Sequence, residues 1–205
     1  IFLWTILFSI GNIFIRWRMR LKSTSTRSFF VVHSFANAII VGLVYNDTIY
    51  TLLNPLQSCT CRTTGCECPA LFVMLGIHLS HILVDFRILT LIDWAHHVFS
   101  CLVCGYFVLS YHVGPIVNFA MMFACGFPGM IDYLLLYLVK TNRVSKILEK
   151  SINTKLNMWI RMPFLVMFGT IVWTCWISGF SHKNINGETE MPLWVLMCFI
   201  VFITM

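Results

Sequence analysis

Ionisable residues lie inside segments of this chain that are apolar enough to enter a bilayer. The groups that stand out are Asp85, the pair His96-His97, and the motif Asp132-Tyr133-Leu134-Leu135. An Asp near the centre of a spanning helix costs about 3 kcal/mol on insertion scales, so such residues usually face a polar interior and mark a functional path. A histidine beside a carboxylate can take and return a proton. These positions are therefore the first candidates for a site.

The composition indicates an integral membrane protein. Of the 205 residues, 59% are hydrophobic and 11% are charged, whereas soluble domains are about 45–50% apolar and about 25% charged. The length fits a single transmembrane domain over residues 1–205, with no soluble domain. Because the chain begins at Ile1 and ends at Met205 inside an apolar run, we expect both natural termini to lie beyond it.

Apolar runs of about 20 residues, the length needed to cross a bilayer, predict an all-α bundle of transmembrane helices. We predict seven spans, at residues 1–15, 28–45, 69–91, 94–111, 114–139, 161–180 and 191–205. The sequence Gly126-Phe127-Pro128-Gly129 interrupts the fifth span and predicts a kink or local unwinding there.

The net charge of +6 arises mainly from basic residues in two connections, 16–27 and 140–161. Seven spans place both connections on one side, which the positive-inside rule marks as cytoplasmic. The charge therefore reports orientation, and we predict no nucleic-acid partner. Residues 140–155 carry interleaved Leu and Ile, so we expect an amphipathic helix on an anionic leaflet. Attraction of an anionic substrate such as an acyl-CoA is the alternative.

The predicted third span carries a polar face. His78, His81 and Asp85 are spaced i, i+3 and i+7, so they share a narrow side of the helix. Asp93 precedes the fourth span, where it can cap the helix or hold one of the two imidazoles that follow.

Two interpretations of these residues stand side by side. In the functional interpretation, these residues form a proton-transfer site. Its catalytic residues are His96, His97, Asp85 and Asp132. Its substrate-contacting residues are His78, His81, Asp93 and Tyr133. In the structural one, the same side chains form interhelical hydrogen bonds worth about 1 kcal/mol each, which set the register of the helices.

A metal site is a further interpretation, because His-x-x-His-x-x-x-Asp and His-His supply five candidate ligands. Zinc needs three or four. The chain has no His-Glu-x-x-His and lacks the histidine boxes of membrane di-iron oxygenases. We therefore predict no metal and no other bound cofactor.

Cysteines cluster in the connection predicted to face away from the cytoplasm, at Cys59, Cys61, Cys66 and Cys68. Four cysteines this close form two disulfides in an oxidising lumen or bind zinc as thiolates. The predicted side of the membrane favours disulfides, and either outcome gives these residues a structural role.

The order Asp85, His96-His97 and Asp132-Tyr133-Leu134-Leu135 across successive spans resembles the TLC-domain family, which includes the ceramide synthases. The resemblance covers roughly Gly76 to Lys140. Where a ceramide synthase has a His-Asp pair shortly before Asp-Tyr-Leu-Leu, this chain has Phe127-Pro128-Gly129, so it looks like an outlying member.

The resemblance implies acyl transfer from acyl-CoA, as co-substrate, to a lipid amine inside the bundle. His96 or His97 would be the general base or acyl acceptor, oriented by Asp85 and Asp132. It also implies the endoplasmic reticulum, with the mitochondrial inner membrane as the alternative. Two other hypotheses stay open: a non-catalytic lipid-binding protein, and a structural or accessory subunit that binds other subunits of a large membrane complex.

Overall fold

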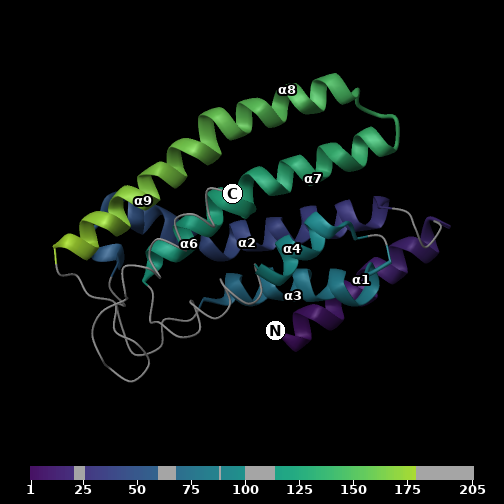
Figure 1. Cartoon of the computed structure of the whole chain (residues 1–205), viewed down its shortest axis with the longest axis horizontal. Helices are drawn as coiled ribbons and strands as arrows, with labels where there is room; N and C mark the ends of the chain where they lie inside the picture. The colour runs from purple at the N-terminus through teal and green to yellow at the C-terminus, as the bar shows by residue number, and fades with distance from the viewer. Residues whose placement is uncertain (21–25, 60–67, 88, 100–113, 179–205) are drawn as a thin grey trace.

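The computed structural model describes residues 1–20, 26–59, 68–87, 89–99 and 114–178, and every regular element in these ranges is helical (Figure 1). The elements are α1 (Phe2–Arg18), α2 (Arg27–Leu53), η1 (Gln57–Cys59), α3 (Pro69–Val84), α4 (Leu91–Phe99), α6 (Pro115–Met121), η3 (Met122–Gly126), α7 (Phe127–Lys140), α8 (Lys146–Leu156), η4 (Asn157–Arg161) and α9 (Met162–Ile177). The prediction of an all-α fold is confirmed for this part of the chain.

Three helices in the described ranges are long and apolar enough to cross a membrane: α2, the continuous helix Pro115–Lys140, and the continuous helix Lys146–Ile177. The prediction of seven spans is not borne out. The helices α1 and α3 have 17 and 16 residues, fewer than the roughly 20 that a span requires, and α4 is described over Leu91–Phe99. The predicted span at 191–205 lies outside the described residues, as does the second part of the one at 94–111.

Two of the long helices contain a π-helical turn, η3 and η4. The turn η3 ends at Gly126, and Pro128 stands in the first turn of α7 directly after it. A wider turn accommodates a proline, whose ring would clash with the carbonyl four residues earlier and which has no N–H to donate. The predicted irregularity at residues 126–129 is thus a π-helical turn within one continuous helix.

The helix predicted in the basic segment 140–155 is present as α8 and is largely exposed, but it is the first part of a longer helix and not a separate element. Its location on an anionic leaflet stays a prediction. Ser145 caps its start by accepting a hydrogen bond from the Leu148 N–H at 3.2 Å. No glycine or proline follows before Met162, so the helix continues through η4 into α9. The segment therefore packs beside α7 as the first part of a long helix (Figure 1).

The two basic connections lie at the same end of the molecule. Figure 1 shows the end of α1, the start of α2 and the α7–α8 connection together at one end, while α9 runs to the other. The shared end agrees with the expected topology, and its cytoplasmic location stays a prediction.

Buried apolar side chains form two separate cores. One core joins α1, α2 and α3 and includes Phe8, Ala36, Ile40 and Leu71. The other joins α6, α9 and η1 and includes Phe119, Phe168 and Val172. The helix α2 contacts both α3 and α7, so it connects the polar face of α3 to the rest of the bundle.

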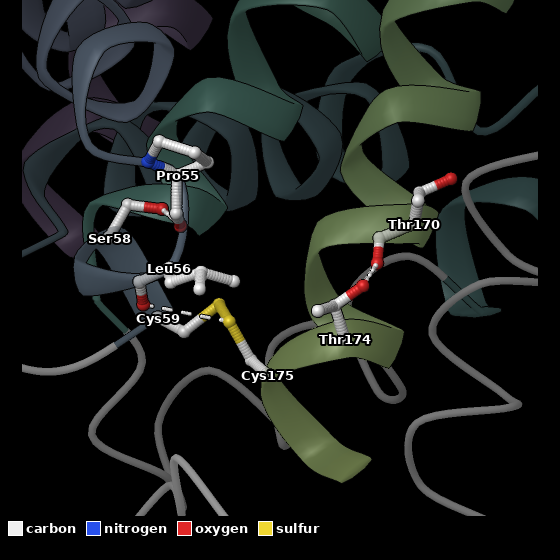
Figure 2. Close-up of a disulfide and its surroundings, with 7 residues drawn as sticks. All are labelled: Pro55, Leu56, Ser58, Cys59, Thr170, Thr174 and Cys175. Atoms are coloured by element: carbon white, nitrogen blue, oxygen red, sulfur yellow. Dashed lines mark hydrogen bonds between the residues drawn. A yellow bond between two sulfur atoms is a disulfide. The ribbon is translucent and has the colours of Figure 1, made fainter. Parts of the chain in front are cut away.

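A disulfide between Cys59 and Cys175 ties η1 to α9 (Figure 2). The sequence analysis did not consider Cys175 as a partner for the cysteine cluster.

Cys61 and Cys66 lie outside the described residues, and Cys68 is a buried free thiol just before α3. Burial, and next Asp47, raise the pKa of Cys68 to about 11, so this thiol does not ionise readily. Disulfides persist in oxidising compartments, as expected for the end opposite the basic connections.

We expect Cys175→Ser to lower the stability by about 2–5 kcal/mol, because the disulfide closes a long loop that spans 116 residues. Thermal unfolding in detergent measures the effect, with the free cysteine variant Cys125→Ser as the control. Reductant should lower the unfolding midpoint of the wild type to that of Cys175→Ser and leave the variant unchanged. Equal midpoints for wild type and Cys175→Ser under oxidising conditions would contradict the role of the disulfide.

Gly76 marks a close approach of α3 to α1. A Cβ atom there would lie 2.5 Å from the Cβ of Trp4 and 3.2 Å from the backbone nitrogen of Thr5. We expect Gly76→Ala to lower the stability by about 1–3 kcal/mol, because the two helices would have to separate. Gly169→Ala is the matched control, since nothing lies within 4 Å of its added Cβ. An unfolding midpoint for Gly76→Ala at or above that of Gly169→Ala would be inconsistent with this packing.

Candidate functional site

The polar face of α3 lies inside the bundle, against α1, α2 and α4. His78, His81 and Asp85 are buried, with exposed fractions of 8%, 0% and 2%. The spacing predicted that they share one face, and the contacts bear this out. Each neighbouring helix adds further polar side chains, so that five histidines, Asp85 and Arg16 are linked by hydrogen bonds and ring contacts.

Asp85 is held by groups from two helices. The Arg16 guanidinium of α1 forms a salt bridge with it, and the Asn12 side chain donates a hydrogen bond to its Oδ2 at 2.9 Å. His81, one turn earlier on α3, lies with Nδ1 at 3.0 Å from the same oxygen. Arg16 also donates from Nε to the Ser28 hydroxyl of α2 at 3.0 Å. The carboxylate is thus the centre of a network that joins three helices.

The network fixes the tautomer of His81. A carboxylate that pairs with Arg16 is an acceptor, so His81 donates from Nδ1 to Asp85 and its Nε2 is left to accept. The Nδ1 of His33 on α2 lies 2.6 Å from that Nε2 and must be the donor. The result is a directed chain of two imidazoles that ends on a carboxylate, an arrangement suited to moving a proton.

A second set of histidines lies beside this chain. The Nδ1 of His78 donates to the Met74 carbonyl at 2.8 Å, and its Nε2 lies 3.4 Å from the Nε2 of His96. His97 stands between the sets, with ring centroids 5.0 Å from His78 and 5.5 Å from His81. One ring nitrogen from each of His78, His96 and His97 lies within 4.8 Å of the others. His97 is buried, whereas His96 is exposed in the described part of the chain.

Asp132 and Tyr133 have different surroundings, although the sequence placed both in the site. The Tyr133 ring contacts His33 with a centroid distance of 4.3 Å and therefore borders the cluster. The charged neighbours of Asp132 include Glu149 and Arg161, on the α8–α9 side. Adjacent residues of a helix point about 100° apart, which separates the two side chains.

Asp93 has a local role at the start of α4. Its carboxylate accepts hydrogen bonds from the backbone N–H and the hydroxyl of Thr90, at 2.9 and 2.8 Å, and the Asp93 N–H donates to the Thr90 hydroxyl at 3.2 Å. This reciprocal arrangement caps the helix that carries His96 and His97. Asp93, which the sequence analysis assigned to substrate contact, therefore positions α4 in the structure.

The sequence analysis missed His33, Arg16 and Asn12. His33 lies in an apolar run, 48 positions before His81. The spacing of residues along one helix cannot predict a contact between two residues so far apart in the sequence. Arg16 was assigned to a basic connection, yet it stands near the end of α1 and turns to Asp85. An isolated histidine within a predicted span was the available signal, since such residues usually face the bundle interior.

Comparison with protein-family models, with curated proteins and with solved structures gives no match. The similarity to the TLC-domain family therefore rests on the motifs of the sequence alone.

We expect the Arg16–Asp85 pair to show strong coupling. Arg16→Met and Asp85→Asn should each lower the stability by about 3 kcal/mol, because each leaves a buried charge or polar group without its partner. The loss of stability in the double variant should be smaller than the sum of the two single losses, by at least about 1 kcal/mol. The reason is that neither side chain is then left without its partner. Thermal unfolding of the four proteins measures this, and simple additivity would show that the two side chains act independently.

Proposed function

We propose that this chain is a membrane protein that acts on lipids and transfers an acyl group from acyl-CoA to a lipid amine, as the resemblance to TLC-domain proteins implies. The observation that carries the proposal is the His33–His81–Asp85 chain with His97 and His96 beside it. Such a cluster inside apolar helices is costly to bury and is typical of a proton path.

The reaction needs a proton acceptor and a proton donor. The amine nitrogen forms a bond with the acyl carbon and loses a proton, while the carbon–sulfur bond of the thioester breaks and the coenzyme A sulfur takes up a proton. His96, the exposed histidine, is the one a substrate reaches, and its ring lies 5.4 Å from that of His97. Asp85 interacts electrostatically with His97, so it stabilises an imidazolium formed there.

The basic end of the molecule suits an anionic donor. Positive side chains at this end are Arg18, Arg27, Lys140, Arg143 and Lys146. Concentrated positive charge attracts a polyanion such as coenzyme A and raises its local concentration. The α3–α4 connection, which precedes the histidine pair, lies toward the same end as this charge (Figure 1).

A second candidate function is a structural or accessory subunit of a membrane complex. Both carboxylate oxygens of Asp85 are already engaged, by Arg16 and by Asn12 and His81. Hydrogen bonds of this kind between neighbouring helices are what a structural tie requires.

The experiment that tests the proposal uses the purified chain in liposomes with a long-chain acyl-CoA and a long-chain amino alcohol. We expect mass spectrometry to detect the N-acylated lipid, and His96→Ala to lower its rate of formation at least about 100-fold, the usual value of a general base. Thr170→Ala, near the disulfide (Figure 2), is the control and should keep the wild-type rate.

Absence of the N-acylated product with the wild type, or equal rates for wild type and His96→Ala, would refute the enzyme hypothesis. Purification of the native protein in fixed stoichiometry with larger membrane subunits would then favour the accessory role.

A further inference from the structure

We propose that His78, His96 and His97 bind a divalent transition-metal ion, and that zinc is the ion this site fits best. Imidazole nitrogens are good ligands for zinc, and three histidines with an open fourth position form a common catalytic zinc site. The sequence analysis predicted no metal because the chain lacks the known linear metal-binding motifs. The three ligands come from α3 and α4 and form no such motif.

The distances fit a tetrahedral ion. Two nitrogens bound at about 2.0–2.1 Å in tetrahedral geometry lie about 3.3 Å apart. The Nε2 atoms of His78 and His96 are 3.4 Å apart, and the three ligand atoms all lie within 4.8 Å of one another. Small rotations of the imidazole rings would bring the third nitrogen to the same spacing.

His78 is oriented for metal binding. Its Nδ1–H donates to the Met74 carbonyl, so in the neutral ring Nε2 carries the lone pair that faces His96. Metal-ligating histidines usually donate their other ring N–H to a carbonyl or carboxylate, which fixes both tautomer and ring orientation. The Met74 carbonyl supplies that second contact here.

His97 has a ring nitrogen in need of a partner. The residue is 4% exposed, and no hydrogen bond to its Nδ1 occurs among the described residues. A buried polar atom without a partner is unfavourable, and a bound ion nearby would draw this ring into coordination. The contact between His78 and His96 is also long for a hydrogen bond, which leaves those nitrogens available.

His81 is not part of the site, although it lies on the same face of α3 as His78. Both of its nitrogens are engaged, Nδ1 by Asp85 and Nε2 by His33. The linear pattern His-x-x-His-x-x-x-Asp is thus divided in three dimensions between a proton chain and a metal triad. The exposed edge of His96 gives an ion and a substrate access to the triad.

Metal binding deepens the proposed function but does not depend on it. If the proposed acyl transfer takes place, zinc at this site would act as a Lewis acid on the acyl carbonyl, and His96 would contribute to the reaction as a zinc ligand. The ion itself can be counted without any lipid substrate, so the two proposals fail separately.

The test uses the whole chain, purified in detergent with a tag that contains no histidine. Metal is removed with a chelator, zinc chloride is added, and bound zinc is counted by mass spectrometry after gel filtration. We expect one zinc per chain in the wild type, and at least about 10-fold weaker binding in His78→Gln and in His96→Gln. His33→Gln is the matched control, and it should bind zinc like the wild type.

Cobalt provides a second measurement, because a tetrahedral cobalt site absorbs visible light strongly and the two ligand variants should lose this absorption. Gel-filtration profiles and unfolding midpoints identify any variant that fails to fold, and His96→Gln, at an exposed position, is expected to fold. Zinc that remains bound equally in His78→Gln and His96→Gln belongs to other ligands such as cysteines and overturns the proposal. Zinc binding without acyl transfer would leave the metal site standing and remove the proposed function.

Discussion

The burial of one carboxylate, Asp85, sets the arrangement of the first three helices. Taking a carboxylate and a guanidinium out of water costs several kcal/mol for each ion, and only close pairing with further hydrogen bonds offsets that cost. Arg16 and Asn12 supply these contacts from α1, and His81 supplies one from α3. Any movement of α1 away from α3 would remove Arg16 and Asn12 from the carboxylate, so the close packing at Gly76 and the polar network support each other.

The same network divides the histidines into two groups with different abilities. His33 and His81 form a chain that leads to Asp85, and both ring nitrogens of His81 are engaged in it. His78, His96 and His97 lie alongside with nitrogens that face one another. One set is therefore suited to carrying a proton and the other to holding an ion, and a single face of α3 contributes to both.

The long axis of the molecule separates two chemical environments. The basic connections gather at one end, so positive charge is concentrated there (Figure 1). The Cys59–Cys175 disulfide closes the other end and requires oxidising conditions to persist. The histidine cluster lies between α1, α2, α3 and α4, and α4 is capped by Thr90 and Asp93.

Composition and apolar run length were sufficient to predict helices that are long and apolar enough to cross a membrane, because these depend on local hydrophobicity and backbone hydrogen bonding. The spacing of His78, His81 and Asp85 was sufficient to predict one polar face, because helix periodicity is a local property. The tertiary structure alone decided that His33 and Arg16 complete that face, that Cys59 pairs with Cys175, and that Asp132 lies toward Glu149 and Arg161. Those contacts join residues far apart in the chain, and they follow from how helices pack, which the periodicity of a single helix does not contain.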